Sequence, residues 1–103
     1  MTIVTPDDLS TQLNLPEEIK AIDFDLLARK VAAAQAYLES ILGYKVEDRF
    51  GGVDQDPVPP PLKEATCQLA AHWYENREAA GEGAKVIPFG VSEIVDAYRD
   101  WSF

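Results

Sequence analysis

The sequence predicts an all-α fold, a small bundle of about four helices in which a short N-terminal helix, two long helices and a short C-terminal helix follow one another. Three observations support this prediction. Apolar residues recur at helical spacing over two long stretches, residues 23–42 and 62–78. Proline and glycine residues bound both stretches, and the segment between them alternates only weakly. The length of 103 residues fits one domain, which we place at residues 1–103.

The short N-terminal helix begins after Thr5, whose side chain suits an N-cap. Pro6 suits the first helical position, and two acidic residues follow at the positive end of the helix dipole. Leu9 and Leu13 are spaced by one helical turn and are expected to face the core. Residues 14–20 end this helix and form a connector with room for one helical turn.

The first long helix runs from about Asp23 to Leu42 and stops at Gly43, where a left-handed conformation commonly ends a helix. Its apolar positions alternate in steps of three and four residues, which predicts one buried stripe. The positions expected to face the core are Phe24, Leu27, Val31, Ala34, Leu38 and Ile41. Those expected to flank this stripe are Ile22, Leu26, Ala33 and Tyr37, and those expected to face water are Arg29, Lys30, Gln35 and Glu39.

Residues 44–57 separate the two long helices. Residues 44–50 show a weak alternation of apolar and polar side chains that is compatible with a short strand. Gly51, Gly52 and the run from Asp54 to Pro57 have turn and loop chemistry. We therefore expect an extended, exposed loop here, with a small hairpin as the alternative.

The second long helix follows three prolines, Pro59 to Pro61, the last of which suits a first helical turn. Its predicted core stripe consists of Leu62, Ala65, Leu69 and Trp73, widened by Cys67, Ala70, Ala71 and Tyr74. This helix is expected to end between Glu78 and Gly81. A last helix is predicted over residues 91–100, with Val91, Ile94, Val95 and Tyr98 on one face.

The chain is strongly acidic, with a formal net charge of −9 at pH 7. Gripping nucleic acid requires clustered Lys and Arg, so this composition disfavours a protein that holds DNA or RNA. It equally disfavours binding to an anionic membrane, and no apolar run approaches the ~20 residues that a membrane-spanning helix needs. An acidic wall is compatible with a conduit through which DNA passes without being held.

No arrangement of residues predicts catalysis, a metal site or a cofactor. His72 is the only histidine, and although a carboxylate lies at helical spacing from it, no nucleophile accompanies it, so we interpret it as structural. Cys67 lies on the apolar side of its helix and is expected to be a small core residue. The loosely spaced acids Asp48, Asp54 and Asp56 lack the glycine and closing glutamate of a calcium loop. We therefore predict that the protein is not an enzyme and uses no metal or cofactor.

Aromatic residues gather in the second half of the chain, at Trp73, Tyr74, Tyr98, Trp101 and Phe103. Buried aromatic side chains often dominate the energy of protein interfaces. Two interpretations of Trp101 and Phe103 stay open: these side chains fold back onto the core, or they anchor a partner.

Four runs of residues stand out in combination: 59–65 (PPPLKEA), 71–78 (AHWYENRE), 88–91 (PFGV) and 98–101 (YRDW). Together they resemble the small head–tail connector (adaptor) family of tailed bacteriophages and related gene-transfer particles. The opening, a short helix and then a long one that ends at Gly43, is also similar to that family. The resemblance spans nearly the whole chain, although the segment between the two long helices is shorter than many members carry.

The resemblance implies a structural virion protein without enzymatic activity, located at the head–tail junction after assembly in the host cytoplasm. Members of the family form a ring beneath the portal, extend the DNA channel and dock tail-completion (stopper) proteins. The implied partners are therefore the portal protein, a tail-completion protein and further copies of the chain in a cyclic homo-oligomer. The isolated protein need not assemble before it meets the portal, and DNA would pass through without specific binding.

A cyclic ring requires a heterologous interface, in which one face of a subunit meets a different face of its neighbour. We expect the two long helices to supply these faces. The candidate residues at this boundary are Tyr37, Tyr74, Arg77 and Glu78. The portal or the next ring is expected to contact residues 44–57 or the C-terminal segment. The candidate contacts in that segment are Tyr98, Arg99, Trp101 and Phe103.

The alternative function is that of a small acidic helical module for protein interaction or regulation, without enzymatic activity. A DNA-binding regulator would carry a basic face, which this composition does not provide.

Overall fold

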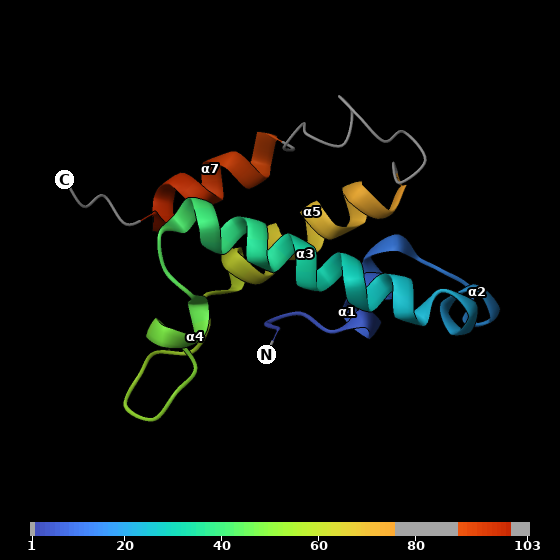
Figure 1. Cartoon of the computed structure of the whole chain (residues 1–103), viewed down its shortest axis with the longest axis horizontal. Coiled ribbons are helices and arrows are strands. Elements are labelled where there is room, and N and C mark those ends of the chain that lie inside the picture. The colour runs from blue at the N-terminus through green and yellow to red at the C-terminus, as the bar shows by residue number, and fades with distance from the viewer. Residues whose placement is uncertain (1, 76–88, 100–103) are drawn as a thin grey trace.

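The computed structural model describes residues 2–75 and 89–99, and within these ranges the chain consists of helices joined by loops, with no strand. The helices are α1 (Pro6–Leu13), α2 (Glu17–Ile22), α3 (Phe24–Leu42), α4 (Val46–Arg49), α5 (Pro60–Glu75) and α7 (Phe89–Tyr98). The predicted all-α bundle is therefore confirmed. Figure 1 shows α3 running along the length of the molecule, with α2 toward one end and α4 toward the other.

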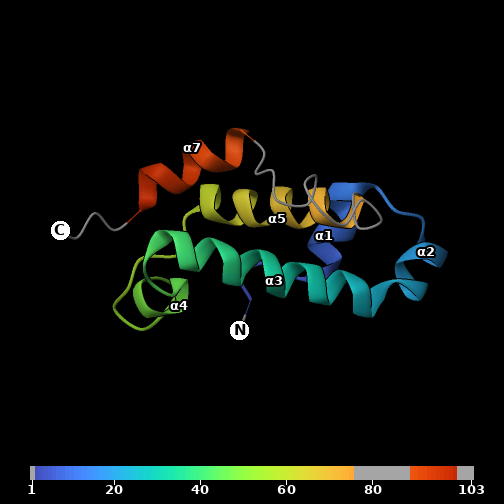
Figure 2. The same cartoon turned by 45° about the horizontal axis from the view of Figure 1, so that its top comes forward.

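The core lies between α3 and α5, which pack side by side (Figure 2). Helices α1 and α7, from the two ends of the described chain, each pack against both of these long helices. The largest completely buried side chains are Leu9, Leu27, Val31, Leu42, Val46, Leu62, Thr66, Leu69 and Val91. Because the first and last helices share this core, the bundle is closed by contacts between residues far apart in the sequence.

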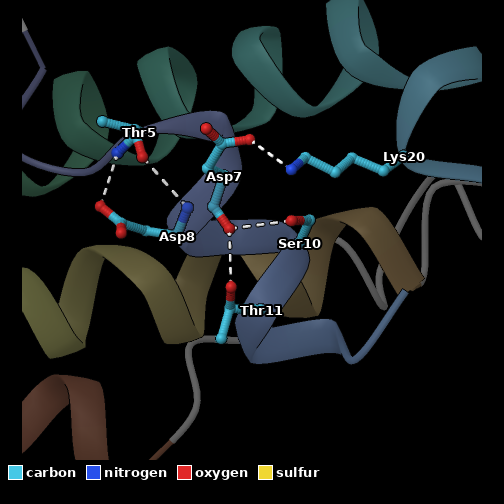
Figure 3. A network of polar contacts seen from close by, with 6 residues as sticks. All are labelled: Thr5, Asp7, Asp8, Ser10, Thr11 and Lys20. Carbon is cyan, nitrogen blue, oxygen red and sulfur yellow. Dashed lines mark hydrogen bonds and ion pairs between the residues drawn. The ribbon is translucent and has the colours of Figure 1, made fainter. Parts of the chain in front are cut away.

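Helix α1 begins as the sequence predicts. The Thr5 hydroxyl accepts a hydrogen bond from the backbone N–H of Asp8, and the Asp8 carboxylate accepts one from the N–H of Thr5, both at 3.0 Å (Figure 3). This capping box satisfies two amide groups that a helix start otherwise leaves unpaired. Asp7 in the same turn forms an ion pair with Lys20 of α2, with 2.8 Å between Oδ1 and Nζ. The hydrogen bond in this pair raises the pKa of Lys20 and links α2 to α1.

Two segments are more helical than predicted, since a connector with room for one helical turn was expected before the first long helix and a loop or small hairpin after it. Helix α2 replaces the expected connector, and acidic residues occupy its first turn at the positive end of the dipole. Helix α4 replaces the expected short strand or hairpin after Tyr44. The Glu39 carboxylate accepts a hydrogen bond from the N–H of Val46 at 2.7 Å, and the Val46 side chain is buried. A strand would need a partner strand, which the described residues do not supply.

The buried face of α3 includes Leu27, Val31, Ala34 and Leu38, as predicted. Phe24 continues this stripe but is 45% exposed, because it lies in the first turn of α3 at the end of the bundle. The prediction that Gln35 faces water is also wrong, since this residue is only 5% exposed. Its Oε1 accepts a hydrogen bond from the N–H of Ile3 at 2.6 Å, so the segment before α1 covers it. Ile41, predicted to face the core, is half-buried.

Helix α5 begins at Pro60, slightly earlier than predicted, and the end predicted between Glu78 and Gly81 lies outside the described residues. Its predicted core positions are buried at Leu62, Ala65, Cys67, Leu69, Ala70, Ala71 and Tyr74, and half-buried at Trp73. Helix α7 begins and ends two residues earlier than predicted, with Val91 and Val95 buried. None of the helices described is long and apolar enough to span a membrane.

Candidate interaction surfaces

One end of the bundle carries exposed apolar side chains around the joint between α2 and α3. We call Ile19, Ile22 and Phe24 the joint patch. Ile22 is 77% exposed, Ile19 is 39% and Phe24 is 45% exposed, and α2 contains no buried residue. Asp23, the single residue between the two helices, has φ −96° and ψ 11°, so the chain changes direction there. The joint patch therefore stands at the end of the bundle rather than within its core.

Tyr74, a candidate boundary residue, holds this joint from the C-terminal part of α5. Its side chain is only 7% exposed, and its hydroxyl donates a hydrogen bond to Oδ2 of Asp23 at 2.5 Å. A hydrogen bond to an ionised carboxylate is stronger than one between neutral groups. Tyr74 thus lies inside the subunit, directly behind the joint patch. The two candidates that follow it, Arg77 and Glu78, lie outside the described residues.

Tyr37, the remaining boundary candidate, is 38% exposed on α3. Its ring meets that of Trp73 of α5 edge to face, with 5.6 Å between the ring centroids and 75° between the planes. Such aromatic pairs contribute about 0.5–1.5 kcal/mol beyond their buried area. Tyr37 therefore both links the two long helices and presents part of its ring at the surface.

The opposite end of the bundle carries a loop, residues 50–57, that its own hydrogen bonds hold in shape. The side chain of Gln55 accepts from the N–H of Gly52 at 3.0 Å and donates to the carbonyl of Asp48 at 2.8 Å. A Cβ atom at position 52 would lie 2.6 Å from Gln55 Oε1, so glycine allows this close approach. Gly51 has φ +81°, a conformation that favours glycine, and its N–H donates to the carbonyl of Asp56 at 2.8 Å. The loop presents Val53, which is 92% exposed.

Tyr44 joins this end to the C-terminal helix. Its hydroxyl donates a hydrogen bond to the backbone carbonyl of Tyr98 at 2.7 Å, and the Arg49 guanidinium lies 4.1 Å from the centre of its ring. Tyr98 is half-buried at the end of α7, and Arg99 after it is exposed. The structure therefore brings together the two segments predicted to contact other proteins. Their remaining candidates, Trp101 and Phe103, lie outside the described residues.

The residues considered for chemistry occupy the bundle itself. Cys67 is buried, and burial, with lesser effects from Glu64 and Asp8, raises the pKa of its thiol from 9.0 to about 11. The thiolate is the reactive form, so Cys67 behaves as a core residue at neutral pH. His72 is half-buried on α5. Across residues 2–75 and 89–99, no group of three or more His, Cys, Asp or Glu side chains is arranged to hold a metal ion.

Together these features define a small all-α protein with exposed apolar side chains at both ends of its bundle, as in a module that binds other proteins. The particular family follows from comparison with known families. The model of the family described as phage gp6-like head-tail connector protein matches residues 5–99, and the chain belongs to this family. It is a family of structural phage proteins. Neither the curated proteins nor the solved structures gave a significant match.

Sequence reasoning missed the joint patch as a surface, and within the predicted contact segment 44–57 it did not single out Val53 at the tip of the loop. Phe24 continues a core stripe, so its position on the helix indicates burial, and only the packing of the neighbouring helices shows where that stripe leaves the core. A signal for the joint was available at Asp23, between two apolar residues at the junction of a connector and a long helix. Val53, an isolated apolar residue among Gly and Asp in a turn segment, was the corresponding signal for the loop.

Proposed function

We propose that this chain is a head–tail adaptor: one subunit of a ring that lies beneath the portal, extends the DNA channel and docks tail-completion proteins. Membership of the connector family supports this proposal. Among the contacts in the structure, the strongest support is the hydrogen bond from Tyr44 to the carbonyl of Tyr98. This hydrogen bond joins the start of residues 44–57 to the start of the C-terminal segment. These are the two segments that we assign to the portal or to the next ring.

A ring subunit on a portal needs one kind of surface for its neighbours and another for the portal. We assign one of the two faces of the boundary between subunits to the joint end, and the portal contact to the loop end with residues 44–57. The candidate boundary residues are Tyr37, Tyr74, Arg77 and Glu78, of which buried Tyr74 would act by holding the joint. The candidate portal contacts are Tyr98, Arg99, Trp101 and Phe103.

The acidic composition fits a channel wall that DNA passes without being held. With a net charge of −9 per chain, a ring repels the phosphate backbone more strongly as copies are added. The protein would act at the head–tail junction of the virion, after assembly in the host cytoplasm. We assign residues 1–103 to one connector domain, because α1 and α7 both pack against the same pair of long helices.

The test is to mix the purified protein with its cognate portal and to image the mixture by negative-stain electron microscopy, with mass measurement. We expect a stoichiometric cap on the portal. Deletion of residues 101–103 should abolish portal binding and leave the helical content measured by circular dichroism unchanged. The matched control, Ser102→Ala, should bind as the full chain does.

Two outcomes would contradict parts of this proposal. Unchanged portal binding by the truncated protein would remove the C-terminal segment from the contact. A monomer that ignores the portal but shifts a DNA band in a gel would contradict the adaptor function itself, and would favour a regulatory module instead.

A further inference from the structure

An apolar cavity lies at the end of the bundle opposite the joint patch. It has a volume of about 260 Å³, and its walls include Ile3, Phe50, Gly51, Val58 and Lys63. These residues come from the segment before α1, from the loop after α4 and from the first turn of α5. An apolar cavity of about 150 Å³ is large enough to hold a benzene ring, so this cavity has room for an aromatic or branched aliphatic side chain.

We propose that the joint patch of one subunit docks into this cavity of a second copy of the chain. The proposal rests on the function proposed above, and it names the two surfaces that meet between neighbours in the ring. Ile22 and Phe24 are the side chains that would enter or cover the cavity. Exposed apolar area of this kind is what a specific interface removes from water.

The positions of the two surfaces favour a second copy as the occupant. Helix α2 and helix α4 lie toward opposite ends of the longest axis of the molecule in Figures 1 and 2. The patch of one chain therefore cannot fill the cavity of the same chain. When two different surfaces of identical chains meet, the pair still has one free surface of each kind. Further copies can therefore add at both ends, and the assembly closes only as a ring.

Charge also distinguishes the two ends. Residues 2–25, which include the joint, contain six acids and one base, a net charge of −5. Residues 44–63, which supply most of the cavity wall, contain four acids and three bases, a net charge of −1. Two joint ends repel one another most strongly, whereas the cavity wall contains both Lys63 and Glu47 and adds no net charge of its own. The unlike pairing is therefore less repulsive than a contact between two joint ends, and a contact between two loop ends would leave both joint patches exposed.

The test is cross-linking between two variants that each add one exposed cysteine to the buried Cys67, namely Ile22→Cys in the patch and Thr2→Cys in the cavity wall. Both native residues are exposed, so neither substitution should disturb the core. The variants are mixed, bound to the cognate portal or concentrated alone, and treated with a short thiol-specific cross-linker. We expect heterodimers of Ile22→Cys with Thr2→Cys as the main product. Neither variant alone should give homodimers.

Two controls accompany this experiment. The unmodified chain, whose single cysteine is buried Cys67, should give no product. A mixture of Ile22→Cys with Ser92→Cys, which places the second thiol on the exposed face of α7, should give none either. Homodimers of Ile22→Cys would overturn the proposal, because they indicate a symmetric contact between two joint patches.

Absence of heterodimers on portals that carry a visible ring would also overturn this inference, while the adaptor function would stand. Absence of any ring or portal binding by the unmodified chain would instead contradict the function on which the inference rests. The double variant, Ile22→Cys with Thr2→Cys, adds a stricter outcome. It should yield a ladder of cross-linked oligomers, and a product that stops at dimers would contradict head-to-tail contact.

Discussion

The two ends of this bundle are built in the same way but present different surfaces. At each end a tyrosine hydroxyl ties a helix junction: Tyr74 binds Asp23 at the joint, and Tyr44 binds the carbonyl of Tyr98 beside the loop. Each end also carries an exposed apolar side chain, which is Ile22 on a short helix at the joint and Val53 on the loop at the other end. The loop end also contains an apolar cavity, whose walls include Phe50 and Val58.

This difference matters because it makes the two ends complementary rather than alike. Two identical surfaces that bind one another give a closed dimer, whereas two unlike surfaces on one chain give a ring or a filament. The loop end has a second distinction, since Gln55 holds its shape from within. A segment ordered before binding loses less conformational entropy when it docks. The comparison therefore separates the joint patch, which we assign to copies of the chain, from the tip of the loop at Val53, which we assign to the portal. The cavity beside this loop receives the joint patch of the next copy.

The largest expected effect comes from placing a charge at each end in turn. Ile22→Asp should weaken association between copies about tenfold to a hundredfold, because the burial of one isoleucine side chain is lost, and should leave the portal affinity of a single subunit unchanged. Val53→Asp should weaken portal binding by a similar factor and leave cross-linking between copies intact. Sedimentation measures the association between copies, and a surface binding assay measures the affinity of a single subunit for the portal.

Each variant serves as the control for the other, because both native residues are apolar and highly exposed. Circular dichroism should show the same helical content for both. If either substitution weakens both kinds of contact equally, the joint patch and the loop tip do not have separate roles.

A smaller effect is expected from removing the two tyrosine hydroxyls. Tyr74→Phe should lower the free energy of unfolding by about 1.5–2 kcal/mol, since the hydroxyl donates to a carboxylate. Tyr44→Phe should cost only about 1 kcal/mol, because its acceptor is a neutral carbonyl and the ring that Arg49 covers is retained. Denaturant unfolding measures both. Tyr37→Phe, at a partly exposed ring, should stay within about 0.5 kcal/mol of the unmodified chain.

If Tyr44→Phe lowered the free energy of unfolding more than Tyr74→Phe, the hydrogen bond at the joint would be the weaker of the two. This outcome would remove the reason to assign Tyr74 to the support of the joint patch.

The long helices were predictable from the sequence because their apolar spacing repeats over several turns. Leu27, Val31 and Leu69 are buried where the periodicity places them, and Thr5 caps α1 as its side chain predicts. The short helix α4 was not predictable, because its start depends on a hydrogen bond from Val46 to Glu39 of a preceding helix. A four-residue segment has too few positions to show a period of its own.

The candidate surfaces show the same limit. Gln35 is polar and was expected in water, yet the segment before α1 folds over it and uses its carboxamide. Phe24 is apolar and was expected in the core, yet it lies where the core ends. Tyr74 was predicted to lie at the boundary between subunits. Its hydrogen bond to Asp23, fifty-one positions away, depends on how the two long helices pack. Spacing along the chain determines which face of a helix a residue occupies, and only tertiary packing determines what covers that face.

The smallest expected effect concerns the loop at Gln55. Gln55→Ala removes two side-chain hydrogen bonds from an exposed loop, so the free energy of unfolding should change by no more than about 0.5 kcal/mol. Portal affinity should nevertheless fall a few-fold, because the loop around Val53 must then be ordered on binding. Gln12→Ala, which removes another exposed carboxamide away from the loop, should change neither quantity. Equal portal affinity for Gln55→Ala and the unmodified chain would show that the shape of this loop is not what the portal binds, and would leave the C-terminal segment as the contact at this end.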